Sequence, residues 1–123
     1  MSLPHPSALV PHRDEALLLC AIDAVGTDGL TASLVVGTHS PFAGPDGALQ
    51  PWSGPEIMAQ AVSAFATFRK GPPYRPKPGL LLGLRHYRCG SEAFARGTRL
   101  TVTVRESTRD VSGSAVFDAT LAK

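Results

Sequence analysis

The longest regular pattern of apolar positions in the chain runs from Trp52 to Lys70. Apolar residues recur there at helical spacing, and further apolar neighbours cover most of the helix circumference. These residues are Ile57, Met58, Ala59, Ala61, Val62, Ala64, Phe65, Ala66 and Phe68. Pro55 suits the first helical turn because it has no N–H to leave unpaired, and Gly71 is typical of the residue that ends a helix. The pattern therefore predicts a long helix that is buried on most sides.

The polar residues of this helix form one narrow stripe. They are Glu56, Gln60, Ser63 and Thr67. Their spacing places all of them on one face of a helix. No other charged residue follows Glu56 before Arg69 and Lys70, where cations suit the negative end of the helix. A single carboxylate thus stands at the entrance of an otherwise apolar helix, and this is where we expect chemistry.

Two shorter patterns before the helix predict a β-hairpin. Ala16–Ile22 is an apolar run of strand length, and Asp23–Gly29 is typical of a turn because it ends in an Asp-Gly pair. Leu30–Thr38 alternates between inward and outward positions, which predicts the returning strand. Its predicted inward residues are Leu30, Ala32, Leu34 and Val36. His39–Gln50 then forms a long loop, and long loops in small domains are often functional.

Three further strands are predicted after the helix. Leu80–Cys89 begins as an unbroken apolar run, after a proline-rich linker that cannot be helical. Thr98–Glu106 is the clearest strand, and Val111–Leu121 follows it through a turn at Ser107–Asp110. The inward residues of the clearest strand are Leu100, Val102 and Val104. One long helix among antiparallel strands indicates an α+β fold in which the sheet wraps around the helix.

Composition bounds the class of protein without identifying it. The chain has 123 residues, of which 43% are hydrophobic and 18% charged, as expected for one soluble globular domain. The formal net charge of +2 is too small to indicate nucleic-acid binding, and no aromatic residues alternate with the basic ones as a stacking platform. We see no signal peptide and no apolar run of membrane-spanning length. We therefore expect neither a nucleic-acid nor a membrane partner.

The two cysteines, Cys20 and Cys89, fit no metal-binding spacing and lie in apolar, strand-like runs. Such positions predict buried free thiols, which indicate a reducing cytoplasm. Four scattered histidines do not make a metal site, so we expect neither a metal nor another cofactor.

Four short segments match the motifs of one enzyme family in order and in spacing. They are Pro11–Leu19 (PHR-x-x-x-LLL), Glu56–Gln60 (E-x-M-A-Q), Gly79–Tyr87 (GLLLGLRHY) and Phe94–Leu100 (F-x-x-G-x-x-L). Together they resemble the 3-hydroxyacyl-[acyl-carrier-protein] dehydratases of the hotdog fold, in the branch linked to aryl polyene pigment synthesis. The resemblance implies a single hotdog domain over residues 1–123, with an antiparallel sheet wrapped around one long central helix.

Two departures from the family pattern bear on activity and on the sheet. Common members carry a catalytic histidine in an H-F-P loop at a position that corresponds here to Phe42, and the nearest histidine in this chain is His39. The pigment-linked branch resembles this chain in replacing that loop by a segment seen here as Pro41-Phe42 and Asp46-Gly47. The family usually ends with one more strand, and this sequence stops at Lys123 before it. Whether the domain lacks that strand stays open.

The candidate site follows from the chemistry that the resemblance implies. Dehydration of a 3-hydroxyacyl thioester needs a base for the α-proton, an acid for the leaving hydroxyl group and polarisation of the carbonyl. In the family, a histidine of one subunit and the helix carboxylate of the other share this work in a narrow apolar tunnel. The resemblance therefore implies Glu56 and His39 as the catalytic pair. The expected substrate-binding residues are Phe42, Trp52, Gly54 and Gln60.

Each candidate also has a structural explanation. Glu56 and Ser53 have the spacing of a capping box, in which the glutamate only stabilises the start of the helix. Gln60, one turn further on, has the reach to hydrogen-bond Glu56 or a substrate, and its structural role is simply to satisfy the polar stripe. His39 is also consistent with a solvent-exposed turn, and His12 is better explained as a structural hydrogen-bonding residue. The sequence leaves the alternatives for Glu56, Gln60 and His39 open.

A run without acidic residues extends from Ile57 to Ser91 and carries six cations. They are Arg69, Lys70, Arg75, Lys77, Arg85 and Arg88. Because acyl carrier proteins are acidic and CoA carries phosphates, the run predicts a positive face for one of these partners. Ordinary solvated side chains are the alternative.

The resemblance implies a dimer, formed either by two identical chains or with a homologous hotdog subunit. A hotdog monomer leaves the sheet edge of Leu80–Cys89 uncovered, and such an edge needs a partner. The favoured function is dehydration of carrier-bound thioesters in fatty acid, polyketide or aryl polyene synthesis. One rival is a hotdog thioesterase in which Glu56 directs water at the carbonyl. The other is a non-catalytic subunit that binds acyl chains or supports an active dehydratase.

Overall fold

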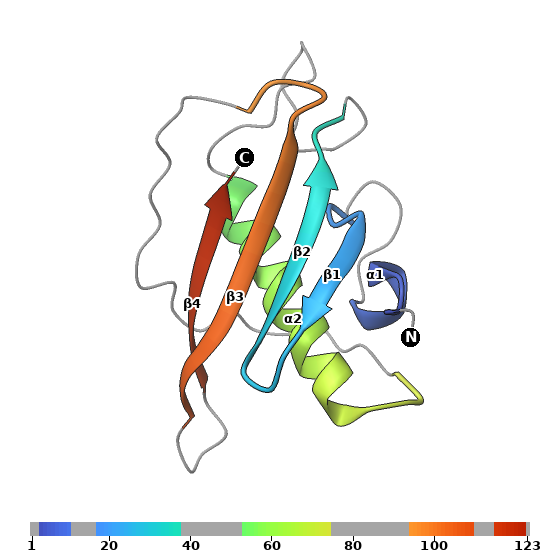
Figure 1. The fold of residues 1–123 in the computed structure, drawn as a ribbon, viewed down its shortest axis with the longest axis vertical. Coiled ribbons are helices and arrows are strands. Elements are labelled where there is room, and N and C mark those ends of the chain that lie inside the picture. Colours follow the sequence, from blue (N-terminus) through green and yellow to red (C-terminus); the bar gives the residue numbers. More distant parts are fainter. Residues whose placement is uncertain (1–2, 11–16, 38–52, 75–93, 110–114, 123) are drawn as a thin grey trace.

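The computed structural model describes residues 3–10, 17–37, 53–74, 94–109 and 115–122 (Figure 1). The elements in chain order are α1 Pro6–Leu9, β1 Ala21–Val25, β2 Gly29–Val35, α2 Gly54–Lys70, β3 Arg99–Arg109 and β4 Ala115–Ala122. The predicted strand Leu80–Cys89 and the predicted loop His39–Gln50 lie outside the described residues.

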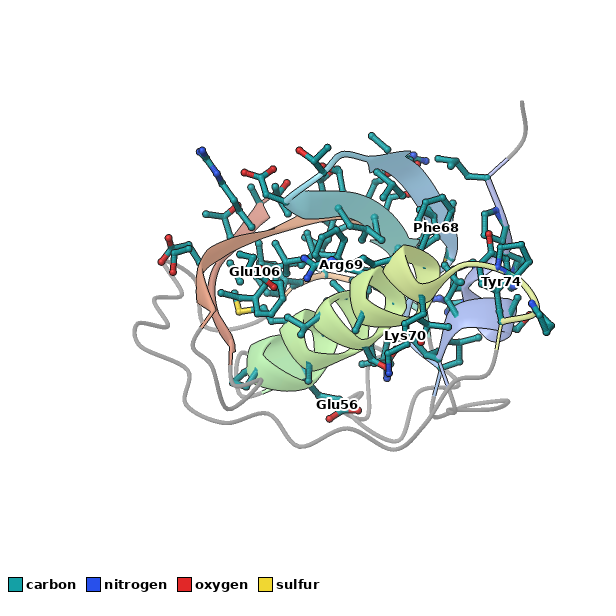
Figure 2. All side chains as sticks on the ribbon, turned by 90° about the horizontal axis from the view of Figure 1, so that it is seen from below. Glu56, Phe68, Arg69, Lys70, Tyr74 and Glu106 are labelled. Atoms are coloured by element: carbon teal, nitrogen blue, oxygen red, sulfur yellow. The ribbon has the colours of Figure 1, made fainter. Side chains whose placement is uncertain are left out.

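The four strands form one antiparallel sheet in the order β1-β2-β3-β4. Helix α2 crosses one face of this sheet diagonally, and the sheet curves over it (Figures 1 and 2). The predicted α+β arrangement, a sheet wrapped around one long helix, is therefore confirmed. The helix also begins and ends where the glycine and proline signals predict, from Gly54 to Lys70 with Gly71 as its C-cap.

The core lies between α2 and the inner face of the sheet. From the helix, Ile57, Ala61 and Ala64 are fully buried and Phe65 is nearly so. The sheet contributes the inward residues that alternation predicts, namely Leu30, Ala32, Leu34, Val36, Leu100, Val102 and Val104, all of them buried. Period-two and period-3.6 patterns thus meet across one apolar layer, which holds the helix in place.

The first hairpin differs from the prediction at its turn. Strand β1 runs from Ala21 to Val25, so it begins and ends later than the predicted Ala16–Ile22. The turn covers only residues 26–28 and is closed by a 2.8 Å hydrogen bond from the Gly26 N–H to the Gly29 carbonyl. The register shifts between Ile22 and Ala24, which inserts Asp23 as an extra residue and breaks the alternation. At Gly29 a Cβ atom would collide with the carbonyl oxygen of Val104, so only glycine permits this approach of β2 to β3.

The second hairpin also extends further than predicted. Strand β3 runs on to Arg109, through the predicted start of the turn at Ser107. A register shift between Glu106 and Thr108 allows pairing with β4 to continue beyond that point. A bulge in the ladder thus replaces the turn that the polar residues of this segment indicate.

Cys20 is exposed, so the prediction that it is a buried thiol is wrong. The residue precedes β1 at the edge of the sheet, where its N–H donates to the Ser33 carbonyl over 2.8 Å. The backbone is thus paired while the side chain faces solvent. Cys89 lies outside the described residues.

Candidate functional site

The entrance of α2 does not form the capping box that its sequence suggests. Ser53 has helical backbone angles, φ −76° and ψ −14°, and its side chain makes no capping hydrogen bond. A side-chain N-cap needs an extended backbone at that residue, because the hydroxyl oxygen must reach the N–H groups of the first turn. Ser53 therefore does not make the hydrogen bond that a capping box with Glu56 requires of it. What remains is a carboxylate in the first turn, where the positive end of the helix favours it.

Glu56 is held by a buried glutamine one turn deeper in the helix. Gln60 Nε2 donates to Glu56 Oε1 over 3.2 Å, and Gln60 itself has no exposed surface. The Leu18 N–H donates to Gln60 Oε1 over 2.9 Å. Because one end of the amide accepts and the other donates, these two bonds fix which way the Gln60 side chain is turned. Of the alternatives for Gln60, the hydrogen bond to Glu56 is present. A role in substrate binding stays a prediction.

The carboxylate lies on the side of α2 that faces away from the sheet. Figure 2 shows Glu56 and Lys70 pointing outward from the helix, opposite the strands. Glu56 is partly exposed, whereas Gln60 behind it is fully buried. A reacting group at this place would meet substrate from outside the core, with a rigid amide behind it.

Of the other predicted site residues, the structure describes Gly54. Gly54 is buried at the first position of α2, where its backbone N–H lies at the positive end of the helix. His39, Phe42 and Trp52 lie outside the described residues, so their predicted roles are untested.

The described residues hold no cluster of metal ligands. No group of three or more His, Cys, Asp or Glu residues in the described ranges could bind a metal ion. His5 is the one histidine within the described ranges, and it accepts a hydrogen bond from the Ser7 N–H at the start of α1. In the same ranges, no helix is long and apolar enough to cross a membrane.

The opposite end of α2 contains an ion pair that the sequence analysis missed. Arg69 Nη1 lies 3.0 Å from Glu106 Oε2, between the helix and the sheet (Figure 2). The Arg69 guanidinium also lies 4.3 Å from the ring centroid of Phe65, which packs edge-on against Phe117. A signal for this pair was present, because Glu106 continues the inward series of Val102 and Val104 in β3. A carboxylate on a core-facing position requires a cation.

This ion pair alters the predicted positive face. Arg69 was expected to face an acidic partner, and it contacts Glu106 and Phe65 instead. Lys70 remains exposed and points outward. The other four cations of the run lie outside the described residues, so for them the face stays a prediction.

Comparison with known proteins identifies the family. The model of the ApeP-like family, described as ApeP dehydratase, matches residues 4–123. Among solved structures, the chain is similar to "The Dehydratase Heterocomplex ApeI:P from Xenorhabdus doucetiae", with a TM-score of 0.85 and 26% sequence identity. That match covers 98% of this chain and 82% of the other. No curated protein matches.

These matches confirm the predicted resemblance to hotdog dehydratases of the aryl polyene-linked branch, and with it the hotdog fold. The family match covers almost the whole chain, from the segment before α1 to the end of β4. The chain belongs to the ApeP-like dehydratase family.

Proposed function

We propose that the protein takes part in the dehydration of 3-hydroxyacyl thioesters to 2-enoyl thioesters, at a site that includes Glu56. The observation that supports this most is the chain of hydrogen bonds from the Leu18 N–H through buried Gln60 to Glu56 Oε1. A structural carboxylate on a surface needs no such support. A catalytic group does, because its orientation must be fixed before the substrate arrives.

The proposed reaction divides between an acid and a base. A base removes the α-proton, the bond between the β-carbon and its hydroxyl oxygen breaks, and the hydroxyl group takes a proton from the Glu56 carboxyl to leave as water. The proton on the base then returns to Glu56, so that the site is reset. We assign the base to His39, the nearest histidine to the family's catalytic position. In this proposal, backbone N–H groups at the start of α2, near Gly54, stabilise negative charge on the carbonyl oxygen.

For assembly, we propose a dimer with a homologous hotdog subunit. The similar structure from Xenorhabdus doucetiae is named a heterocomplex, which supports a heteromeric assembly over a homodimer. The acyl group would be carried by an acyl carrier protein or by CoA. For localisation we propose the cytoplasm, because a free exposed thiol such as that of Cys20 is typical of a reducing compartment. Light scattering at micromolar concentration tests the assembly, alone and with a homologous subunit, and a monomer under both conditions contradicts it.

Product analysis tests the reaction. The protein, alone and with a homologous hotdog subunit, is incubated with a 3-hydroxyacyl pantetheine thioester, and the products are separated by mass. A 2-enoyl thioester with loss of water supports the proposal. Release of a free thiol would instead indicate the thioesterase. Binding of the thioester without turnover, even at high protein concentration, would leave only the supporting-subunit function.

A further inference from the structure

The segment before β1 links helix α2 to the sheet through two of its backbone N–H groups. The Leu18 N–H donates to Gln60 Oε1 on α2 over 2.9 Å. The Cys20 N–H donates to the Ser33 carbonyl on β2 over 2.8 Å. Leu18 and Leu19 are also buried in the core, so the position of this segment relative to α2 is fixed on both sides.

The Leu18 N–H determines how the Gln60 amide is turned. A backbone N–H can only donate, so the amide atom that faces Leu18 has to be the oxygen. The amide nitrogen, which can only donate, then faces Glu56. A reversed amide would place two donors against each other at Leu18 and two acceptors against each other at Glu56, which is unfavourable for buried groups.

This orientation distinguishes the two oxygens of the Glu56 carboxyl group. Gln60 Nε2 donates to Oε1 over 3.2 Å. In a protonated carboxyl group the carbonyl oxygen is the stronger acceptor, whereas the hydroxyl oxygen carries the donated proton. A fixed N–H that points at Oε1 therefore favours the neutral form of Glu56 in which the proton is on Oε2.

Burial places Gln60 behind Glu56. Gln60 has no exposed surface, and its helix neighbours Ile57 and Ala61 are fully buried as well. Glu56 is partly exposed and points away from the sheet (Figure 2). A substrate that approaches from outside the core meets the carboxyl group before the amide. An effect of Gln60 on the reaction is therefore expected to act through Glu56.

We propose that Gln60, held by the Leu18 N–H, is a positioning residue that anchors Oε1 of Glu56 and leaves Oε2 to give its proton to the leaving hydroxyl group. In that step the Oε2–H bond breaks as the new O–H bond of water forms, and the resulting carboxylate keeps its hydrogen bond from Nε2. The proposal rests on the proposed function, because it takes Glu56 as the acid. It also gives the first sequence motif a role at the site, through the backbone of Leu18.

Infrared spectroscopy tests the place of the proton without any turnover. The carbonyl stretch of protonated Glu56 is the band that the wild type shows and Glu56→Gln lacks, at an acidic pH where circular dichroism shows both proteins folded. A hydrogen bond to a carbonyl oxygen lowers its stretching frequency, so Gln60→Met should move the band to higher frequency. With the proton on Oε1 instead, the carbonyl oxygen would be Oε2 and the band would stay in place, which would overturn the proposal.

Steady-state kinetics test whether Gln60 acts through Glu56 or on the substrate. With a 3-hydroxyacyl pantetheine thioester, we expect Gln60→Met to lower kcat by about tenfold or more and to change KM by less than about twofold. A higher KM at unchanged kcat would mean that Gln60 binds substrate, and would overturn the proposal. In a Glu56→Gln background the same substitution should lower the remaining rate no further, and an equal loss in both backgrounds would contradict action through Glu56.

Gln60→Glu is a second variant, because Gln60→Met also removes the acceptor of the Leu18 N–H. The new side chain keeps an oxygen for Leu18 and replaces the donor that faces Glu56. We expect kcat to fall at neutral pH, where two carboxyl groups then face each other. At lower pH the introduced group gains a proton and can donate to Oε1 again, so the rate relative to the wild type should rise. A ratio that does not change with pH would contradict the role of the donor.

Thr67→Val is the matched control, because the Thr67 hydroxyl is also a buried polar group of α2 and donates to the Ser63 carbonyl. It should change neither the Glu56 band nor kcat. If the wild type converts the thioester but the band does not move in Gln60→Met, the positioning role is wrong and the dehydratase function stands. If the band moves but no thioester is converted, Gln60 orients Glu56 as proposed and the enzymatic function fails.

Discussion

The two ends of α2 use charged side chains in opposite ways. At the C-terminal end, Arg69 is paired with Glu106 and stacked on Phe65, and only 28% and 16% of the two charged side chains are exposed. At the N-terminal end, Glu56 is partly exposed and accepts a hydrogen bond from the neutral amide of Gln60. One end thus satisfies its charges with each other, whereas the other orients a charge with a neutral group.

This difference separates stability from function along a single helix. An ion pair between helix and sheet fixes their relative position, and neither partner remains available for other chemistry. A carboxylate that is oriented by an amide keeps its capacity to donate or accept a proton. We therefore expect substitutions at the C-terminal end to change the free energy of unfolding, and substitutions at the N-terminal end to change activity.

The largest expected effect is on activity, at Glu56. Glu56→Gln keeps an oxygen that can accept from Gln60 but removes the proton transfer, so we expect dehydration to fall by about 10²–10⁴-fold with little change in melting temperature. Initial rates on a 3-hydroxyacyl thioester measure it. If His39 is the base, His39→Ala should cause a loss of the same order.

His5→Ala is the control for the histidine, because the contacts described for His5 are those with Ser7 at the start of α1. If Glu56 acts alone, the His39 and His5 variants should both retain the wild-type rate. An unchanged rate in Glu56→Gln would remove this residue from the mechanism and would contradict the assignment of function to the N-terminal end of α2.

The next largest effect is expected at Gln60, which contributes both to stability and to the orientation of Glu56. Gln60→Leu fills similar volume but leaves the buried Leu18 N–H without its acceptor, which should cost about 1–3 kcal/mol of unfolding free energy. The rate should fall as well, because Glu56 loses its fixed donor. Urea denaturation and initial rates on the same samples measure the two effects.

Thr67→Val is the matched control for this substitution. It also removes a buried polar group from α2, but the Thr67 hydroxyl donates to the Ser63 carbonyl within the helix. Among the described residues, no other buried group therefore loses its partner. We expect it to lower stability by less than about 1 kcal/mol and to leave the rate unchanged. A rate that falls equally in both variants would indicate a general loosening of α2.

The elements of this fold follow from local patterns, and its decisive contacts do not. Alternation in Thr98–Glu106 and helical spacing from Trp52 to Lys70 correctly predict which faces of β3 and α2 are buried. The spacing of Glu56 and Gln60 predicts their hydrogen bond, because residues four apart on a helix are neighbours. Periodicity thus determines faces and local pairs.

What periodicity does not determine is which distant group completes a pair. Gln60 bonds the N–H of Leu18, 42 residues away, and Arg69 finds Glu106 across the gap between helix and sheet. The bulge at Asp23 could not be predicted from the sequence either. One extra residue in a strand leaves the amino-acid composition of the segment unchanged, and the sequence does not show which residue is left unpaired. Such contacts depend on how the elements pack, and single-element patterns carry no information about that.

A smaller effect is expected where charges are paired between helix and sheet. Arg69→Met keeps much of the apolar contact with Phe65 but removes the Arg69 charge from the Glu106 carboxylate, which should lower stability by about 1–2 kcal/mol. Glu106→Gln in the same background should recover part of the loss, because the remaining group is neutral. Denaturation midpoints of the two single variants and the double variant measure the coupling, and additive losses would show that the pair contributes little.

The smallest effect is expected at Arg105, whose pair with Asp28 resembles the Arg69 pair in distance but not in exposure. The two atoms lie 3.2 Å apart, yet 74% and 56% of the side chains are exposed, so water and salt compete for both charges. We expect Arg105→Gln to lower stability by less than about 1 kcal/mol, and raising the salt concentration should remove the difference. The hairpin should stay in place, because the Glu106 N–H still donates to the Asp28 carbonyl over 2.6 Å. A loss as large as that of Arg69→Met would mean that burial does not distinguish the two pairs, and that the contrast between them has another cause.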